Sequence, residues 1–207
     1  MILIGQYDSP FFRRVDIALK LYDLPFRQEP WSVFGDADRI RPFNPLTRVP
    51  TLVLAEGDSL IDSHLILDCL DGLVPPDRRL FPQSEPDRRR ALHRAGLATG
   101  IGDKAVSLFY EQRLHTESSD LFVQRCKRQI AEGWQVLEDH YAHAGLPARP
   151  GHDAIALACV WRFVNEAHPG LTQTTSLPAL PALSALAAQM EATAAFQAIS
   201  QPFIAPA

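Results

Sequence analysis

The chain has 207 residues, 20 Lys and Arg against 24 Asp and Glu, and a formal net charge of −4. This length can bury a sizeable core in one or two domains. A composition of 46% hydrophobic and 21% charged residues is that of a globular protein and excludes a mainly disordered chain. The negative balance argues against electrostatic binding to nucleic acid or to an anionic membrane surface.

Cysteine usage and the N-terminus indicate the compartment. Cys69, Cys126 and Cys159 are far apart and form no C-x-x-C pair, which excludes a zinc ribbon and a thioredoxin-type disulfide reductase. The N-terminus lacks a basic region before its short apolar run, and no apolar stretch approaches the ~18 residues that span a bilayer. We therefore expect a cytoplasmic protein with free thiols and no membrane segment.

The first 76 residues alternate buried strands with amphipathic helices. Strands are predicted over 1–4 and 25–31, and a hairpin over 51–55 and 58–61 is predicted around Glu56-Gly57. A helix over 10–22 has Val15, Ala18, Leu19 and Tyr22 on one face. A second helix begins at Ser63, its expected N-cap, with Ile66, Cys69, Leu70 and Leu73 on its apolar side. The stretch between strand 25–31 and the hairpin is a poorly defined helix or loop.

The rest of the chain is predicted to be helical. Four prolines in 73–86 indicate a semi-rigid connection. Apolar spacing then predicts helices around 97–108, 130–141, 155–163 and 182–195. The run Asp87 to Arg90, with Arg94, is read as a solvated helix face or a dimer contact. We divide the chain into an α/β domain (1–76), a linker (77–85) and an all-helical domain (86–207).

Three short segments carry possible chemistry. Ser9 lies between a strand and a helix, where unpaired backbone N–H groups and the helix dipole favour an anion such as a thiolate. The plainer interpretation is that Ser9 only caps the helix. Val49-Pro50 precedes a strand; if its peptide bond is cis, the Val49 backbone can pair with an extended peptide ligand. The plainer alternative is a trans proline opening an edge strand.

The third segment places an acid and a hydroxyl at another helix N-terminus. Asp62 and Ser63 suit a ligand that carries a carboxylate and an amino group. The alternative is a capping pair with His64 exposed. His140 and His143 have helical spacing but no third ligand nearby in the sequence, so we expect no metal site.

Taken together, these segments resemble the cytosolic glutathione S-transferase family, serine type. The matching runs are SPFFRRV from Ser9, NPLTRVPTL from Asn44 and DSLIDSHLILDCL from Asp58. The resemblance covers nearly the whole chain. It implies a thioredoxin-like N-terminal domain followed by an all-α C-terminal domain, the glutathione transferase architecture, in a two-fold homodimer.

The resemblance also implies residue roles. Ser9 would hydrogen-bond the glutathione sulfur and stabilise its thiolate, with glutathione as co-substrate and no metal. Val49 would pair with the cysteinyl backbone, next to a cis Pro50. Asp62 and Ser63 would hold the γ-glutamyl end, and Arg48 the glycyl carboxylate.

The electrophile would be a small hydrophobic molecule lying between the domains. Its pocket would be lined by aromatic side chains of both halves: Phe11, Phe12, Phe109, Tyr110 and Trp161. Such aromatics are also common in plain hydrophobic cores.

Two positions depart from the family pattern. Asp62 stands where the family usually has Glu, which shortens the reach to the ligand amine. Pro150 replaces the hydroxyl residue of a capping box whose acid would be Asp153, which puts the local folding of that helix in question. Tyr7 is an alternative thiol-activating residue, while the absence of a cysteine at position 9 argues against the thiol-transferring classes.

Three functions stay open at this stage. The first is transfer of glutathione to an electrophile. The second is a glutathione-dependent isomerase or dehalogenase with the same glutathione site. The third is a non-catalytic binding module of the same fold, against which the retained Ser9 segment counts.

Overall fold

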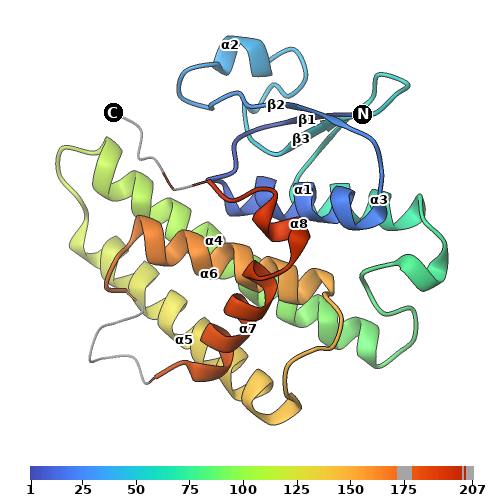
Figure 1. Cartoon of the computed structure of the whole chain (residues 1–207). Helices are drawn as coiled ribbons and strands as arrows, with labels where there is room; N and C mark the ends of the chain where they lie inside the picture. The colour runs from blue at the N-terminus through green and yellow to red at the C-terminus, as the bar shows by residue number, and fades with distance from the viewer. Residues whose placement is uncertain (172–178, 202, 204–207) are drawn as a thin grey trace.

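The N-terminal half contains a four-stranded mixed sheet (Figure 1). The computed structural model describes residues 1–171, 179–201 and 203. The strand order is β2-β1-β3-β4, with β1 parallel to β2 and antiparallel to β3, and β3 antiparallel to β4. The strands are β1 (Ile2–Ile4), β2 (Arg27–Glu29), β3 (Thr51–Val53) and β4 (Ser59–Ile61). All four lie within the predicted strand segments.

Helices cover both faces of this sheet. The short helix α2 (Ala37–Ile40) occupies the segment without a clear prediction, and Ile40 packs with Ile4 and Val53 on one face. On the other face lie α1 (Pro10–Tyr22) and α3 (Ser63–Gly72). The structure therefore has the thioredoxin-like N-terminal fold that we expected.

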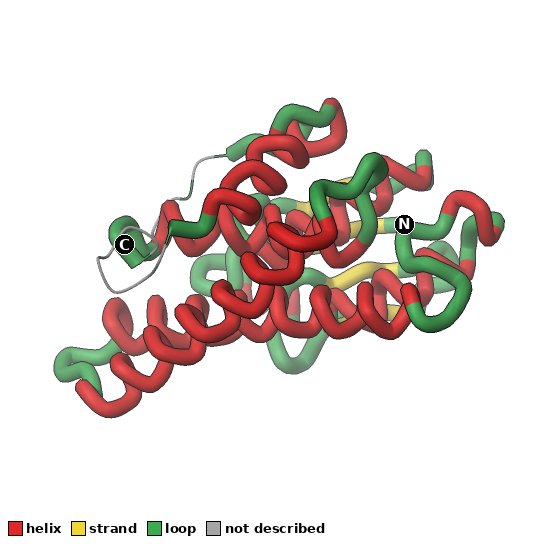
Figure 2. Tube along the Cα trace, turned by 90° about the horizontal axis from the view of Figure 1, so that it is seen from below, coloured by secondary structure: helices red, strands yellow, loops and turns green. Residues whose placement is uncertain are grey.

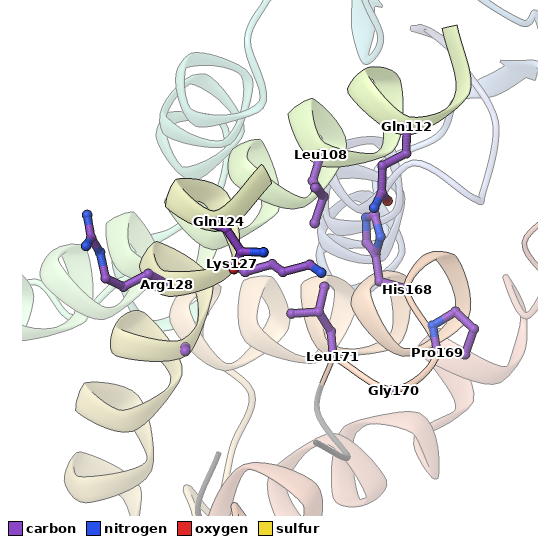
Figure 3. A pocket seen from close by; sticks show the side chains of 10 residues that line it. Leu108, Gln112, Gln124, Lys127, Arg128, His168, Pro169, Gly170 and Leu171 are labelled. Carbon is purple, nitrogen blue, oxygen red and sulfur yellow. The ribbon is translucent and has the colours of Figure 1, made fainter. Parts of the chain in front are cut away.

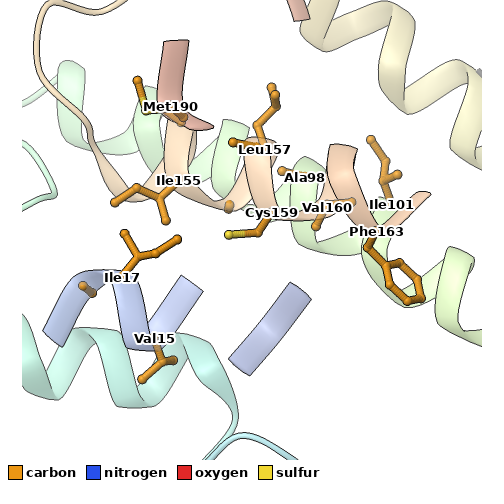
Figure 4. Close-up of a cluster of buried hydrophobic side chains, with 14 of the residues drawn as sticks. Val15, Ile17, Ala98, Ile101, Ile155, Leu157, Cys159, Val160, Phe163 and Met190 are labelled. Carbon is orange, nitrogen blue, oxygen red and sulfur yellow. The ribbon is translucent and has the colours of Figure 1, made fainter. Parts of the chain in front are cut away.

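Helix α1 is buried on two sides. Its predicted apolar face is fully buried, but Ile17, on another side, is buried as well. Figure 4 shows Ile17 directed toward Ile155 of α6 (His152–Ala167), whereas Val15 points the opposite way. Helix α1 lies between two layers, with the sheet and α3 on one side and the helical half on the other. A single apolar face therefore accounts for only part of its packing.

The second half consists of helices in the part of it that the structure describes (Figure 2). Helices α4 (Asp87–Leu114) and α5 (Asp120–Ala144) form a long pair, and α6 packs against α4 and α1. Gly133 permits a close approach of the pair, since a Cβ there would lie 2.8 Å from Ile101 Cγ1. The remaining elements are η1 (Pro76–Arg78), α7 (Pro181–Glu191) and α8 (Ala194–Gln197).

A buried polar cluster joins the two halves at the far end of α1. The Tyr22 hydroxyl donates to Asp71 Oδ1, and His152 Nε2 lies 3.1 Å from the same oxygen. The Leu80 N–H, between η1 and α4, reaches Tyr22 Oη at 3.2 Å and Asp71 Oδ1 at 3.3 Å. Burial acts to raise the pKa of Asp71, but hydrogen bonds from His152 and Tyr22 hold it below its usual value. The cluster links α1, α3, the segment between η1 and α4, and α6.

Four sequence expectations are corrected by the structure. Leu73 is 55% exposed, because α3 ends at Gly72 and Leu67 takes its place in the core. The helix predicted over 182–195 is broken after Glu191 into α7 and α8. Arg94 is not only a solvated residue, since its Nε donates to Asp153 Oδ2 at 2.6 Å. Helix α6 forms despite Pro150, with Gly151 as its N-cap.

Within the residues that the structure describes, no helix is both long enough and apolar enough to cross a bilayer. Cys126 and Cys159 are buried, Cys69 is half-buried, and all three are free thiols.

Candidate functional site

Strand register brings the three predicted segments to one edge of the sheet. Ile4 of β1 pairs with Thr51 of β3, which pairs in turn with Ile61 of β4. The end of β1, the start of β3 and the end of β4 therefore lie side by side. Ser9 follows the first, Val49 precedes the second and Asp62 follows the third.

Helices α1 and α3 run parallel, and the same end of each faces this edge. Arg14 of α1 contacts Ser63 of α3, and Tyr22 contacts Asp71 eight residues further along both helices. The two contacts share one sequence offset, so the helices run parallel. Their N-termini, where backbone N–H groups are unpaired and the dipole is positive, therefore lie at the same end.

Ser9 is the N-cap of α1. Its backbone is extended, and its Oγ accepts a hydrogen bond from the Phe12 N–H at 3.3 Å. Accepting this bond uses a lone pair of the oxygen and leaves the hydroxyl hydrogen free, and no described residue accepts it. Capping and donation to a ligand are therefore compatible in one hydroxyl. The two interpretations of Ser9 do not exclude each other.

Tyr7 is packed toward the interior. Its ring lies 5.7 Å from that of Phe12, a fully buried core residue. Burial, together with the charge of Asp16, raises the pKa of Tyr7. These surroundings disfavour the phenolate, so they count against Tyr7 as a base. A protonated Tyr7 hydroxyl can still donate a hydrogen bond, as Ser9 can, so this pKa does not decide between the two residues.

The loop before β3 presents the Val49 backbone. The Val49-Pro50 peptide bond is cis, as the family resemblance implied. Neither the N–H nor the C=O of Val49 has a partner among residues 1–171, 179–201 and 203. Gly5 makes room for the loop, since a Cβ there would lie 3.0 Å from Val49 Cβ. An extended ligand can therefore hydrogen-bond to both groups of Val49.

Asn44 holds this loop in place. Its Nδ2 donates to the Arg48 carbonyl at 2.9 Å and to Thr51 Oγ1 at 3.1 Å, and its Oδ1 accepts from the Leu46 N–H. Asn44 is fully buried, and all three of these bonds lie within eight residues of chain. The motif NPLTRVPTL begins at Asn44, but the sequence analysis does not predict that Asn44 positions the loop. The Asn-Pro pair, which is typical of a turn, is the sequence signal for this role.

Asp62, not Ser63, caps α3. The predicted N-cap is wrong by one residue: Asp62 Oδ1 accepts from the His64 N–H at 3.4 Å, and Asp62 has a φ of 67°. This backbone leaves Ser63 as the first helical residue. Its side chain is buried and its Oγ accepts from Arg14 Nη1 at 3.4 Å.

Arg14 is a buried cation beneath the site. Its side chain is 1% exposed, and its Nε and Nη2 have no hydrogen-bond partner among the described residues. Burial lowers the pKa of Arg14 to about 10. The sequence analysis missed this residue, because its partner Ser63 lies 49 positions away. A positive charge here favours anionic groups at the N-terminus of α3.

Several ionisable groups face the site from both halves. Burial raises the pKa of Asp8, and burial together with the charge of Asp8 raises the pKa of Tyr110 on α4. Burial and the charge of Asp62 raise the pKa of Asp103, while the charge of Arg48 lowers it. The charge of the exposed Arg48 thus acts on Asp103 and Tyr110, both on α4.

The five aromatic candidates are separated by the fold. Phe12 lies in the core. Phe109 packs on His168 and Phe203, whereas Trp161 packs on Trp134. Tyr110 is 37% exposed and meets the exposed Phe34, a residue the sequence analysis did not single out, at 5.7 Å.

Phe11 packs at the contact between the halves. A Cβ on Gly102 of α4 would lie 3.2 Å from its ring. Phe11, Phe34 and Tyr110 are therefore the better candidates for a wall beside Ser9. No group of three or more His, Cys, Asp and Glu side chains that could hold a metal occurs in the described residues.

Comparison with known proteins agrees with this geometry. Residues 3–78 match the glutathione S-transferase N-terminal domain family. The uncharacterized GST-like protein YibF of Escherichia coli K12 is 29% identical over 167 residues, which are 80% of this chain and 82% of that protein.

Solved structures of similar proteins cover the whole chain. A glutathione transferase family member from Pseudomonas fluorescens Pf-5, with bound glutathione, has a TM-score of 0.85 and 27% identity, covering 98% of this chain and 99% of that one. A glutathione S-transferase from Methylobacterium radiotolerans, in complex with glutathione sulfonate, has a TM-score of 0.86 and 27% identity, covering 100% and 98%. Ser9, Val49 and Asp62 thus lie in the region, residues 3–78, that belongs to the glutathione S-transferase N-terminal domain family, in a chain similar over nearly its whole length to glutathione transferases of known structure.

Proposed function

We propose that this protein transfers glutathione to a small hydrophobic electrophile, with Ser9 stabilising the glutathione thiolate. The observation that carries the proposal is the Ser9 hydroxyl, which caps α1 through its oxygen and keeps its hydrogen for a ligand. The bound glutathione of the Pseudomonas fluorescens relative supports the choice of thiol.

The energy required is modest. A free thiol has a pKa near ~8.5 and is mostly protonated at neutral pH. Lowering that pKa by about two units requires roughly 2.7 kcal/mol of preference for the thiolate. A hydroxyl hydrogen bond to a charged partner contributes roughly 1.5–3 kcal/mol, and the helix dipole adds about 0.3–1 kcal/mol. Ser9 and α1 can together supply this preference, without Ser9 acting as a base.

The remaining glutathione contacts follow from the same edge. The unpaired backbone of Val49, beside cis Pro50, would pair with the cysteinyl residue. Asp62 and Ser63 would hold the γ-glutamyl end. The exposed Arg48 would bind the glycyl carboxylate. At the N-terminus of α3, above the buried Arg14, the γ-glutamyl carboxylate would face positive charge, and Asp62 would face the ligand amine.

A pH titration of bound glutathione tests the proposal. Thiolate absorbance is followed for the wild type, for Ser9→Ala and for Tyr7→Phe. We expect the wild type and Tyr7→Phe to hold the thiol pKa well below ~8.5. Ser9→Ala should lose most of this shift while still binding glutathione. An unshifted thiol in the wild type would favour a non-catalytic binding module, and a lost shift in Tyr7→Phe would move the role to Tyr7.

An isomerase or a dehalogenase would use the same thiolate, so the titration does not separate these reactions. Product analysis does. Transfer leaves a stable thioether, together with halide when the electrophile is a halide. Dehalogenation releases halide without leaving a stable thioether, and isomerisation regenerates free glutathione without releasing halide. We propose transfer as the reaction because, among the described residues outside the glutathione site, no side chain indicates isomerisation or dehalogenation.

We also propose a homodimer built on α3 and α4. Leu65 and Leu92 are 64% and 43% exposed, and the His64–Thr99 hydrogen bond of 3.0 Å holds the start of α3 against α4. Leu92, Gly96 and Gly100 recur every four residues on α4, and a Cβ on either glycine would meet open space. A small-residue face of this kind lets a second copy approach closely.

Sedimentation equilibrium tests the dimer. The double variant Leu65→Asp with Leu92→Asp should be monomeric, whereas Leu121→Asp, at an 83% exposed leucine of α5, should stay dimeric. A monomeric wild type would contradict this proposal.

We also propose that the protein is cytoplasmic. In addition, we propose that it consists of two domains, 1–76 and 86–207, joined by a linker over 77–85.

A further inference from the structure

Helix α1 is joined to the C-terminal end of the described chain by a network of four charged residues: Arg13, Glu191, Arg162 and Glu166. Arg13 lies one helical turn after Ser9 and donates to both carboxylate oxygens of Glu191, the last residue of α7, at 2.5 and 2.7 Å. It is 2% exposed, and its guanidinium lies 5.0 Å from the centre of the Phe196 ring of α8. The network therefore begins at a buried ion pair between the two halves.

Arg162 of α6 continues the network to the chain after α8. Its Nη1 lies 3.5 Å from Glu191 Oε2, and its Nε donates to Glu166 Oε1 at 2.8 Å. Its Nη1 also donates to Ser200 Oγ at 3.1 Å, and its Nη2 donates to the Gln201 carbonyl at 2.9 Å. One guanidinium thus holds both α7 and the chain after α8 against α6.

The network ends at Phe203. Its backbone N–H donates to Glu166 Oε2 at 3.0 Å. Its ring packs edge-on against Phe109 at 5.4 Å and against Phe163 at 5.5 Å, with interplanar angles of 89° and 83°. Aromatic rings attract each other in this arrangement. The hydrogen bond and the two ring contacts thus hold Phe203 against α4 and α6.

Phe109 places Phe203 beside the proposed electrophile wall. It follows Gly102 by seven residues on α4, so the two point in the same direction from the helix to within about 20°. Phe11 packs on this side of α4, at Gly102, and the ring of Tyr110 lies 6.2 Å from that of Phe109. Phe203 therefore extends the aromatic surface that Phe11 and Tyr110 begin.

The residue before Phe109 points elsewhere. Figure 3 shows Leu108 directed into a separate cavity between α4, α5 and the turn after α6, which Lys127 and Leu171 also line. Consecutive residues of an α-helix are turned by about 100°. The network thus acts on the aromatic side of α4 and not on this cavity.

A reaction between a bound thiolate and an electrophile requires a fixed spacing between the groups that hold them. A misplacement of about 1 Å can lower the rate about 100-fold. Ser9 lies at the start of α1, whereas Phe203 packs on the helical half. Glu191 contacts Arg13 on one side and Arg162 on the other, so it joins the two parts of the network.

We propose that Glu191 is a positioning residue for the transfer reaction and that Phe203 is part of the electrophile wall. Through Arg13, Glu191 holds α1 and its Ser9 against the helical half. Through Arg162, it holds Phe203 in the wall. This inference rests on the proposed function and adds to it the residues that set the distance between thiolate and electrophile.

Calorimetric binding of two ligands to the full chain tests these roles without turnover. Glutathione occupies only the thiol site, whereas S-(2,4-dinitrophenyl)glutathione also places an aromatic group against the electrophile wall. The ratio of their dissociation constants therefore measures the wall. We expect the wild type to bind the conjugate more tightly than glutathione.

Glu191→Gln should reduce this ratio about five- to tenfold, the value of one well-placed aromatic contact. Its dissociation constant for glutathione should change less than about twofold, because the thiol site shares no partner with Glu191. Phe203→Ala should reduce the ratio by a similar factor. The double variant should lose about as much as the larger single loss and not the product of the two, because Glu191 acts through Phe203.

Glu138→Gln is the matched control. Glu138 is a buried glutamate at the opposite end of α7, where it accepts from the N–H groups of Ala182 and Leu183 at 2.9 and 3.0 Å. Its replacement should lower the free energy of unfolding and leave the ratio unchanged. Loss of a buried glutamate alone would therefore not reproduce the effect of Glu191→Gln.

Glu166→Gln tests the same path from a more exposed position. The Glu166 side chain is 34% exposed, so the change should affect folding less than Glu191→Gln does. It weakens the hydrogen bond to the Phe203 N–H and should reduce the ratio about two- to threefold.

Three results would overturn the inference while the proposed function stands. The first is a wild type that binds glutathione and the conjugate equally. The second is an unchanged ratio in Glu191→Gln together with a lower free energy of unfolding, which would make the network purely structural. The third is a double variant that loses the product of the single effects, which would separate Glu191 from Phe203. Absence of glutathione binding by the wild type would instead overturn both proposals.

Discussion

The two ends of the parallel pair α1 and α3 use polar residues in opposite ways. At the N-terminal end, the Ser9 hydroxyl hydrogen and the Val49 backbone have no partner in the described part of the chain. At the C-terminal end, Tyr22 and Asp71 bind each other, and with His152 and Leu80 they form one buried cluster. The same two helices thus offer hydrogen bonds to a ligand at one end and use them for folding at the other.

This contrast separates the expected effects of substitution. An unpaired group near solvent can be removed with little loss of stability, but the ligand interaction is lost. Removing one member of a buried cluster leaves its former partners unsatisfied, which lowers the free energy of unfolding. Changes at the N-terminal end should affect activity, and changes at the C-terminal end should affect stability.

Ser9→Ala should have the largest effect. Removing one preorganised donor to a reacting anion typically lowers the rate about 10²–10³-fold. We expect a loss of this size in kcat/KM with an aromatic chloride as electrophile. The lost N-cap should lower the free energy of unfolding by only about 1 kcal/mol, measured in urea. A large loss of stability with unchanged activity would reverse the comparison.

Asp71→Ala should show the opposite pattern. It leaves Tyr22, His152 and the Leu80 N–H without their shared acceptor. We expect the free energy of unfolding to fall by about 2–3 kcal/mol, while the dissociation constant of glutathione changes less than twofold. Asp68→Ala, at an exposed position of the same helix, is the matched control and should be neutral in both measurements.

The C-terminal cluster also predicts a pH dependence. Burial lowers the pKa of His152 in the folded protein, so the unfolded chain binds the extra proton first as the pH falls below about 6.5. His152 should therefore reduce stability progressively below that pH, by at most about 1.4 kcal/mol per pH unit. Asp71, whose pKa is lowered, adds a second loss only below about 3.8.

Urea denaturation at a series of pH values checks this prediction. His152→Gln removes the titrating group and should flatten the wild-type slope between about pH 6.5 and 5. His64, His140 and His168 also have lowered pKa values, so some slope should persist in the variant. Identical slopes in both proteins would contradict the role assigned to His152.

Asp8→Asn should have the smallest effect, at the N-terminal end. The Asp8 carboxylate precedes Ser9, and a negative charge there opposes a second one on sulfur. Its removal should lower the pKa of bound glutathione slightly and change kcat/KM only a few-fold. The thiolate titration measures this directly. A raised thiol pKa would mean that Asp8 helps the anion through a hydrogen bond instead.

The sequence predicted the N-terminal end better than the C-terminal end. Helix 10–22 was predicted with the observed bounds, because Ser9-Pro10 marks its start and apolar spacing marks its length. The three segments that meet at the glutathione site were predicted from three short motifs. Arg14 with Ser63, and Tyr22 with Asp71 and His152, were not predictable in this way. Their members lie 49 to 130 positions apart and meet only in the folded chain.

Helix α1 belongs to both halves at once, and this affects how the chain is expected to fold. Its Ile17 faces Ile155, and its buried Arg13 binds Glu191 of α7 through two hydrogen bonds of 2.5 and 2.7 Å. A fragment ending near residue 78 would expose both to water. We therefore predict that the recognisable N-terminal region does not fold on its own. We expect the full chain to unfold in a single cooperative transition, with the fragment unfolded or aggregated under the same conditions.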